Sequence, residues 1–315
     1  MLINFLIVIE YREYHGPFIK SCPCSPFTVS CGYHNLNLHT GCPYDCSYCI
    51  LQVYLDHKSP VFSINLGDLK NELKEFSVRN EQVRIGTGEL SDSLAYDHRT
   101  GYSLKIISLF EMFSQVVFEF KTKSNQIGNL LRVKNVLSNL VVSWSLNPGQ
   151  IASREETRAP SLKNRLRAMN QIQKRGYKIG IHLDPIIFVD DWQALYTGLI
   201  NQIVSVVDPA RVVWISLGAL RFPYSLREHI FKNKKSRLFE GELVKGYDNK
   251  YRYFKPLRLE MFKYISEKIR TLISAHIPLY LCMEDKEAWE EVFPRVKPDT
   301  NEINKQLYLS VFEIK

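Results

Sequence analysis

The sequence lacks any apolar run long enough to cross a bilayer. The longest run, Met1 to Ile9, is interrupted by Asn4 and falls well short of the roughly 20 residues that a spanning helix needs. The basic region and small-residue cleavage site of a signal peptide are lacking as well. We therefore expect Met1 to Ile9 to form a buried strand, and the protein to be cytoplasmic with no membrane partner.

Low-complexity tracts and repeats of fixed period are also absent. Hydrophobic residues make up 45% of the 315 residues and charged residues 23%, which excludes disordered, fibrous and solenoid proteins. Lysine and arginine outnumber aspartate and glutamate by 41 to 33, a net charge of +8. The sequence therefore predicts a globular chain, and its basic charge favours a polyanionic partner such as a nucleic acid.

Cysteine is scarce and unevenly distributed. Six of the seven cysteines lie between Cys22 and Cys49, Cys282 stands alone, and there is none from Ile50 to Leu281. An odd number without a secretory signal argues against a disulfide framework. Metal binding or catalysis is the favoured use.

Short apolar runs alternate with longer amphipathic stretches from about residue 35 onward. The runs predict six strands, at Asn35 to Thr40, Val83 to Thr87, Val116 to Lys121, Leu140 to Ser145, Lys178 to Leu183 and Val212 to Leu217. The stretches predict helices at Leu69 to Phe76, Tyr102 to Phe113, Asn125 to Leu137, Ser161 to Lys174 and Trp192 to Val204. This order indicates an α/β fold, a partial (β/α)6 barrel of the TIM type.

The residues that follow these six strands are polar, reactive or glycine-bearing, as expected where a barrel places its chemistry. We divide the chain into an N-terminal segment (1–34), the barrel (35–220) and a small C-terminal α/β extension (221–315). In the extension, we expect helices at Pro256 to Ala275 and Asp285 to Val292 around a strand at Pro278 to Met283.

The loop after the first strand carries Cys42, Cys46 and Cys49 in the spacing C-x3-C-x2-C. Three thiolates this close can hold an iron-sulfur cluster that leaves one iron open. The alternative is a structural zinc site completed by His39 or by one of the three upstream cysteines.

The triplet, with Tyr48 before its last cysteine, and the six strand-helix units resemble the radical S-adenosylmethionine (SAM) superfamily. Further segments resemble the spore photoproduct lyase family and its lyase-like DNA repair photolyase group: Gly41 to Leu55, Gly88 to Ser93, Phe120 to Lys123, Ser143 to Asn147 and Glu156 to Ser161. The resemblance implies a 4Fe-4S cluster on the three cysteines. It also implies SAM cleavage to a 5′-deoxyadenosyl radical, with an electron from a donor such as ferredoxin or flavodoxin.

The resemblance also implies a SAM site. Gly88 and Glu89 are similar to the element that receives the SAM ammonium group, and Lys123 to the lysine that meets its carboxylate. Ser145 is similar to a serine near the ribose or carboxylate. Tyr48 and Asn147 join this set, although Ser145 and Asn147 could equally be turn residues before Pro148.

The sequence departs from the family at one catalytic position. Glu89 stands where spore photoproduct lyases carry a hydrogen-donating cysteine, and a carboxylate cannot donate a hydrogen atom. We therefore expect that repair by the family's own route does not operate. The remaining donors are a tyrosine, 5′-deoxyadenosine, or Cys22, Cys24 and Cys31, which could alternatively bind a second metal or be small buried residues.

A basic and aromatic segment in the extension is the candidate nucleic-acid contact: Lys250, Tyr251, Arg252, Tyr253, Lys255 and Arg258. Cations can contact phosphates and aromatic rings can stack on bases. The alternative is a solvated hairpin whose tyrosines pack on the barrel. We expect a radical SAM enzyme that acts on a base in DNA. The other candidates are a radical SAM enzyme for a peptide or small molecule, and a zinc-stabilised nucleic-acid-binding module without catalysis.

Overall fold

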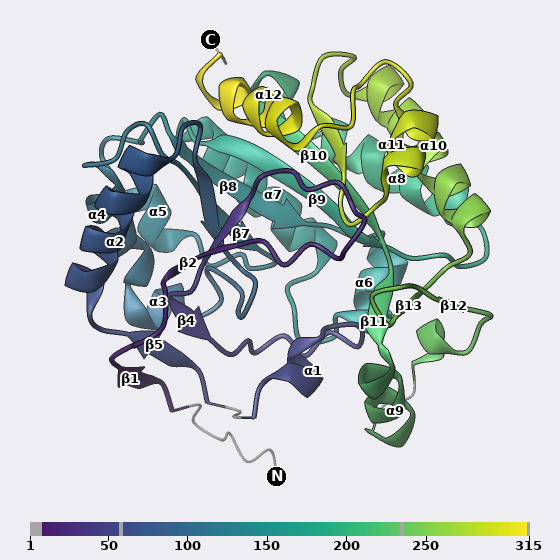
Figure 1. Cartoon of the computed structure of the whole chain (residues 1–315), viewed down its shortest axis with the longest axis horizontal. Coiled ribbons are helices and arrows are strands. Elements are labelled where there is room, and N and C mark those ends of the chain that lie inside the picture. The colour runs from purple at the N-terminus through teal and green to yellow at the C-terminus, as the bar shows by residue number, and fades with distance from the viewer. Residues whose placement is uncertain (1–7, 57–58, 234–235, 314–315) are drawn as a thin grey trace.

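The fold is built around one curled sheet of eight strands (Figure 1). The computed structural model describes residues 8–56, 59–233 and 236–313. The strand expected at Met1 to Ile9 lies almost wholly outside the described residues. Within the described ranges, no helix is long and apolar enough to cross a membrane.

Seven strands of this sheet are parallel, in the order β14-β10-β9-β8-β7-β6-β3, and β2 is antiparallel to β3 at one edge. Their bounds are β2 Ile19–Ser21, β3 His34–Leu36, β6 Arg84–Thr87, β7 Val117–Thr122, β8 Leu140–Ser145, β9 Lys178–Ile186, β10 Val212–Ala219 and β14 Leu279–Leu281. The prediction of an α/β partial barrel is confirmed. The sheet continues past residue 220, because β14 pairs with β10.

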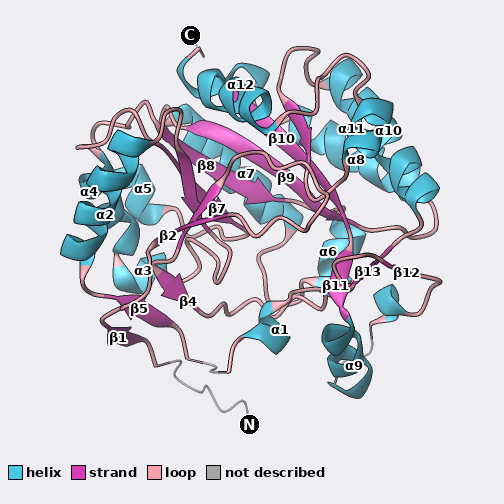
Figure 2. Cartoon of the chain, viewed as in Figure 1, coloured by secondary structure: helices cyan, strands magenta, loops and turns pink. Residues whose placement is uncertain are grey.

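Helices cover the outer face of the curled sheet (Figure 2). They are α2 Leu66–Arg79, α4 Tyr102–Phe110, α5 Gly128–Arg132, α7 Leu162–Lys174, α8 Trp192–Val204 and α10 Lys255–Leu272. Side chains alternate along each strand, so apolar residues such as Phe118, Phe120 and Trp144 are buried beneath the helices. The other side chains of the same strands point into the barrel.

The predicted first strand, Asn35 to Thr40, is two strands in the structure. The chain leaves the barrel sheet after β3 in a tight turn, in which the Leu38 amide donates to the Leu36 carbonyl at 3.1 Å. β4 (His39–Thr40) then pairs with β5 (Val61–Ser63), which also pairs with β1 (Glu10–Arg12). This small sheet lies beside the barrel and leads directly into the three-cysteine loop.

The predicted helix at Asn125 to Leu137 is much shorter, since α5 ends at Arg132. Side chains from elsewhere satisfy the carbonyls that a longer helix would use. The Tyr177 hydroxyl donates to Leu130 at 2.8 Å, and Arg175 donates to Val133 at 2.6 Å. Tertiary contacts therefore replace the helical hydrogen bonds in this segment.

The two ends of the barrel differ. α12 (Thr300–Phe312) covers the end where the strands begin, where Asn304 accepts from Arg84 of β6 and donates to the Gln82 carbonyl, both at 3.0 Å. Loops that follow the strands gather at the opposite end, with α1 (Leu51–Tyr54), α6 (Gly149–Glu155) and the three-stranded sheet of β11 (Arg221–Pro223), β13 (Lys250–Arg252) and β12 (Val244–Lys245) (Figure 1). This second end carries the candidate site.

Candidate active site

The three-cysteine loop is attached to the loop that follows β6. The Gly41 amide donates to the Leu90 carbonyl at 2.9 Å, and Gly41 has a φ of +91°, which glycine adopts without strain. A Cβ atom at this position would come within 3.0 Å of the Pro60 backbone. Cys42, Cys46 and Cys49 follow on a loop that ends at α1.

Two adjacent glutamates at the end of α6 accept hydrogen bonds from this loop. Glu155 accepts a side-chain hydrogen bond from Ser47 of the loop and another from Ser236, the latter at 2.8 Å. The Ser47 amide also donates to the Glu155 carbonyl at 2.9 Å. Glu156 accepts from the Tyr48 hydroxyl. The loop residues between Cys46 and Cys49 are therefore bound to α6 by side chains and backbone.

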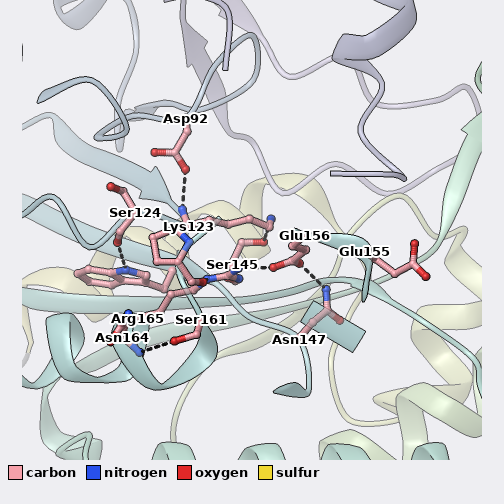
Figure 3. A network of polar contacts seen from close by, with 12 residues as sticks. Asp92, Lys123, Ser124, Ser145, Asn147, Glu155, Glu156, Ser161, Asn164 and Arg165 are labelled. Carbon is pink, nitrogen blue, oxygen red and sulfur yellow. Dashed lines mark hydrogen bonds and ion pairs between the residues drawn. The ribbon is translucent and has the colours of Figure 1, made fainter. Parts of the chain in front are cut away.

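Glu156 is almost fully buried and forms an ion pair with the equally buried Arg165 of α7 (Figure 3). It also accepts from Asn147 at 3.1 Å. Burial would raise the pKa of Glu156, but Lys123 and Arg165 outweigh that effect and lower it. The carboxylate is therefore ionised at neutral pH, and Arg165 in turn donates to the Ser145 carbonyl at 3.1 Å.

Lys123 lies at the end of β7, above this pair (Figure 3). Its Nζ donates to Ser145 Oγ at 2.8 Å and sits 5.7 Å from the centre of the Tyr48 ring. Its backbone amide donates to the buried Asp92 carboxylate at 2.6 Å. The structure thus brings four predicted cofactor residues into one group: Lys123, Ser145, Tyr48 and Asn147.

Gly88 and Glu89 lie on a different part of the same rim. Both line a cavity of about 540 Å³ at the barrel mouth, which Tyr48 also lines. The exposed Glu89 side chain hydrogen-bonds Asn35, and burial of part of the carboxyl raises its pKa. Tyr48 therefore connects the Lys123 group with this cavity.

The floor of the cavity carries a buried polar network that no sequence motif indicated. Glu119 of β7 accepts from Tyr33 at 2.5 Å and from Ser143, and it lies 2.8 Å from His182 Nε2. His182 Nδ1 lies 2.6 Å from Ser216 Oγ. Burial and Lys121 lower the pKa of His182 more than Glu119 raises it, so the imidazole is neutral. Although burial opposes ionisation, His182 and the hydroxyl donors lower the pKa of Glu119 to about 2.

One ion pair borders this network. Arg221 donates to both Asp184 oxygens, at 3.3 and 3.4 Å, and to Cys282 Sγ at 3.4 Å. Burial works against the charged form, but Arg221 and Lys121 lower the pKa of Asp184 to about 2. A signal for these residues exists: polar residues at every second position of otherwise apolar strands, Glu119 and Lys121 in β7 and His182 and Asp184 in β9.

The upstream cysteines lie close to this cavity. Cys22 and Cys31 line it, and so does Cys282 after β14. Cys24 does not line the cavity, but its side chain interacts with that of Cys22, since each shifts the pKa of the other. The N-terminal segment therefore brings thiols to the barrel mouth.

We expected the basic aromatic segment to be available for contacts with phosphates. In the structure, much of it instead makes contacts within the protein. Arg258 is buried and forms two 2.9 Å hydrogen bonds to Glu284. Arg252 pairs with Asp248, and Lys255 pairs with Asp285 at 3.0 Å and with Glu287. The sequence could not reveal these acidic partners, most of which are distant along the chain.

The aromatic residues of the segment are also packed. Tyr253 is buried and accepts from the Phe188 amide at 3.1 Å, and the Tyr251 ring lies 6.1 Å from that of Phe222. Lys250 lines the cavity. Of the six predicted contacts, Lys250 is the one that the structure places on the cavity wall.

The His39 side chain makes its contacts with Asp92 and Phe62 rather than with the cysteine loop. Its Nε2 lies 3.2 Å from the Asp92 carbonyl, and its ring stacks on Phe62 at 4.6 Å. Burial lowers its pKa to about 4. In the described part of the chain, no group of three or more histidine, cysteine, aspartate or glutamate side chains has the arrangement to hold a single metal ion. The His39 contacts argue against a zinc site completed by this residue.

A curled parallel sheet whose first strand leads to a three-cysteine loop defines the radical SAM class of fold. A family model described as spore photoproduct lyase matches residues 26–279. The chain belongs to the spore photoproduct lyase family, whose members are radical SAM enzymes.

Individual relatives agree with this assignment. A spore photoproduct lyase of Clostridium acetobutylicum is 25% identical over 242 residues, which are 75% of this chain and 68% of the relative. The solved structure of a spore photoproduct lyase complexed with dinucleoside spore photoproduct has a TM-score of 0.75 at 21% identity, covering 87% of this chain and 82% of that one. A mutant with bound AdoMet and dinucleoside spore photoproduct has a TM-score of 0.72 at 20% identity, covering 87% and 81%.

Replacing Glu156 with glutamine should destabilise the fold. The change leaves the Arg165 guanidinium buried without its counter-charge, which costs about 3–5 kcal/mol in comparable sites. Urea unfolding under anaerobic conditions measures the loss. The matched control is Glu291→Gln, which removes a half-exposed partner of Lys263 and should cost less than about 1 kcal/mol. Equal losses in the two variants would contradict the assigned role of the buried pair.

Acid should destabilise the protein partly through Glu119. Its pKa in the folded state is lowered from 4.5 to about 2, so its contribution is complete above about pH 4.5 and is lost as the pH falls toward 2. Glu119→Gln should therefore flatten the fall of unfolding free energy between pH 4.5 and 3. Urea midpoints across this range, with the surface variant Glu75→Gln as control, provide the measurement. A slope unchanged by Glu119→Gln would refute the prediction.

Proposed function

We propose that this protein is a radical SAM enzyme that acts on a thymine photoproduct in DNA, within a reducing cytoplasm. The observation that carries the proposal is the three-cysteine loop, fixed beside a cavity of about 540 Å³ that can receive an extruded base. Membership in the spore photoproduct lyase family and the relatives that bind dinucleoside spore photoproduct support the substrate class.

The donor set fits a 4Fe-4S cluster. Cys42, Cys46 and Cys49 lie close enough that their charges act on one another. Burial and then the charge of Asp92 raise the pKa of Cys42, and Cys49 and Cys46 raise it further. Burial also raises the pKa of Cys46 to about 12, while Lys123 opposes that change. Three thiolates from one loop are the ligands of a cluster with one open iron. When bound, such a cluster supplies the electron that cleaves SAM.

The surrounding residues would bind and orient SAM. The Lys123 ammonium, held at Ser145 and beside the Tyr48 ring, would pair with the SAM carboxylate. Glu89 on the cavity rim would accept from the SAM ammonium. Asn147 keeps Tyr48 in place through Glu156. A one-electron donor such as ferredoxin or flavodoxin completes the proposed partners.

DNA would approach the mouth of the barrel. Lys250 on the cavity wall supplies positive charge near an extruded photoproduct. Phe27, Tyr247 and Phe254 expose 81%, 96% and 62% of their surfaces beside this mouth, around a neighbouring hollow that Ser25 and Asp248 also line. Exposed rings of this kind can stack against bases left unpaired by extrusion.

Reconstitution tests the proposal. Anaerobic treatment with iron and sulfide should load about four irons per chain. Replacing Cys42, Cys46 or Cys49 with alanine should abolish the cluster's visible absorption, whereas Cys282→Ala should retain it. With SAM, dithionite and a dinucleotide spore photoproduct, the loaded enzyme should form 5′-deoxyadenosine and consume the photoproduct. Stoichiometric zinc without iron, or 5′-deoxyadenosine formation with an untouched photoproduct, would overturn the proposal.

Lys123→Met should weaken SAM binding by about 1.5–3 kcal/mol, because a hydrogen bond to a charged group is lost. Glu89→Gln should have a similar effect at the other end of the methionyl group. Equilibrium dialysis with labelled SAM measures the affinity, and the cluster spectrum should stay unchanged in both variants. Lys163→Met, on the exposed face of α7, is the control for loss of a lysine. An affinity indifferent to both site substitutions would remove these residues from the SAM site.

A further inference from the structure

The N-terminal segment places one thiol of a pair on the cavity wall. Cys22 directly follows β2, and its amide donates to the Tyr33 carbonyl at 2.9 Å, which extends the pairing with β3. The Cys24 amide then donates to the Cys22 carbonyl at 2.7 Å, in a tight turn over Pro23. Cys22 and Pro23 line the same cavity as Tyr48 and Gly88. Cys22 therefore faces the cavity that three of the candidate SAM residues, Tyr48, Gly88 and Glu89, also line.

The two thiols differ in protonation. The hydrogen bond to Cys24, and then burial, raise the pKa of Cys22, so it keeps its proton. The same bond lowers the pKa of Cys24 to about 6, although burial opposes the change. Ser30, Arg221 and Lys250 lower it further. At neutral pH, the Cys22 thiol consequently donates a hydrogen bond to the Cys24 thiolate.

We propose that Cys22 donates the hydrogen atom that ends the radical reaction, and that Cys24 stabilises the sulfur radical that remains. This inference rests on the proposed function, because it requires a carbon-centred radical on the photoproduct. The Cys22 S–H bond breaks and its hydrogen atom forms a C–H bond, which leaves a thiyl radical. The Cys24 thiolate then shares an electron pair with that radical to give a disulfide radical anion.

The remaining electron needs an acceptor. A disulfide radical anion is a strong one-electron reductant, and the oxidised form of the one-electron donor protein accepts its electron, leaving a Cys22–Cys24 disulfide. A disulfide across a single intervening residue is strained and easily reduced. A cellular dithiol reductant therefore returns the pair to its starting state by thiol-disulfide exchange.

The other thiols of the wall lack this pairing. Cys282 accepts a hydrogen bond from Arg221, and burial raises its pKa to about 12. Cys31 is held through its backbone carbonyl, which accepts from Arg84. Cys22 differs from these two in its place beside Cys24, because the Cys24 amide donates to the Cys22 carbonyl at 2.7 Å and keeps both residues in one tight turn.

Deuterium transfer tests the donor. Thiol hydrogens exchange with solvent, so the reconstituted enzyme in D2O should place deuterium on a carbon of the released thymine, detected by mass spectrometry. In Cys22→Ala, this label should be lost while 5′-deoxyadenosine still forms. Cys31→Ala and Cys282→Ala should retain the label. Retention of deuterium in Cys22→Ala, or its loss only in one of the other two variants, would overturn the proposal.

The role of Cys24 has separate readouts that a merely structural residue would not alter. After turnover with reduced ferredoxin or flavodoxin in place of dithionite, and without added thiol, peptide mapping should recover a Cys22–Cys24 disulfide. Cys24→Ala should still label the product in its first turnover. A first turnover in which Cys24→Ala forms no labelled thymine, or wild-type protein without the disulfide, would refute the stabilising role.

A third measurement does not depend on catalysis. Alkylation of Cys24 by iodoacetamide in the unloaded protein should follow a midpoint near pH 6, and Cys22→Ala should move that midpoint upward, since the donor of its hydrogen bond is gone. The groups that face Cys24 are Cys22, Ser30, Arg221 and Lys250. A midpoint near the ordinary thiol value of about 8.5 in both proteins would show that the Cys22 and Cys24 side chains do not interact, and would overturn the proposed role of Cys24. Failure of the proposed function would instead appear as an unconsumed photoproduct with this midpoint intact.

Discussion

The position of the cysteine loop depends on two adjacent buried carboxylates, Glu155 and Glu156. A buried carboxylate is unfavourable unless hydrogen bonds and opposite charge compensate it. The compensating groups come from the loop itself, through Ser47 and Tyr48, and from Arg165 on α7. The carboxylates are thus satisfied only when β8, α6, α7 and the loop are all in place. This requirement joins the geometry of the three-cysteine loop to the assembly of the barrel core.

Buried carboxylates in the interior of the barrel are also compensated by hydrogen bonds or by opposite charge, but from other residues. Glu119 is satisfied by a neutral histidine and hydroxyl groups, whereas Asp184 is satisfied by the charge of Arg221. Each of these side chains projects inward from a strand that is apolar on its helix-facing side. Because the acids are already paired, the cavity is bordered by charges whose positions are fixed before a ligand enters, which reduces the reorganisation that binding requires.

Local patterns predicted most of the fold, and tertiary contacts decided the rest. α8 was predicted at Trp192 to Val204, and β8 at Leu140 to Ser145, as the structure has them, since their periodicity is strong. The single strand predicted at Asn35 to Thr40 is wrong, because the chain turns at Leu38 and His39–Thr40 then pair with the distant segment β5. In the site, the cysteine spacing was readable as a local motif. The partners of Arg258 and Glu156 were not, because ion pairs between distant segments leave no pattern in sequence.

The location of the N-terminal segment explains how the site can differ from that of its relatives without a change of barrel. β2 pairs with β3 and carries Cys22 to the same cavity whose rim holds Glu89. A hydrogen donor needs only to reach the radical carbon, and several segments border that space. A thiol on the loop after β6 and a thiol after β2 are therefore two alternative positions from which a donor can reach the radical carbon. Under the proposal that Cys22 is the donor, the position after β6 is free for a carboxylate, which suits the ammonium group of SAM better than a thiol does.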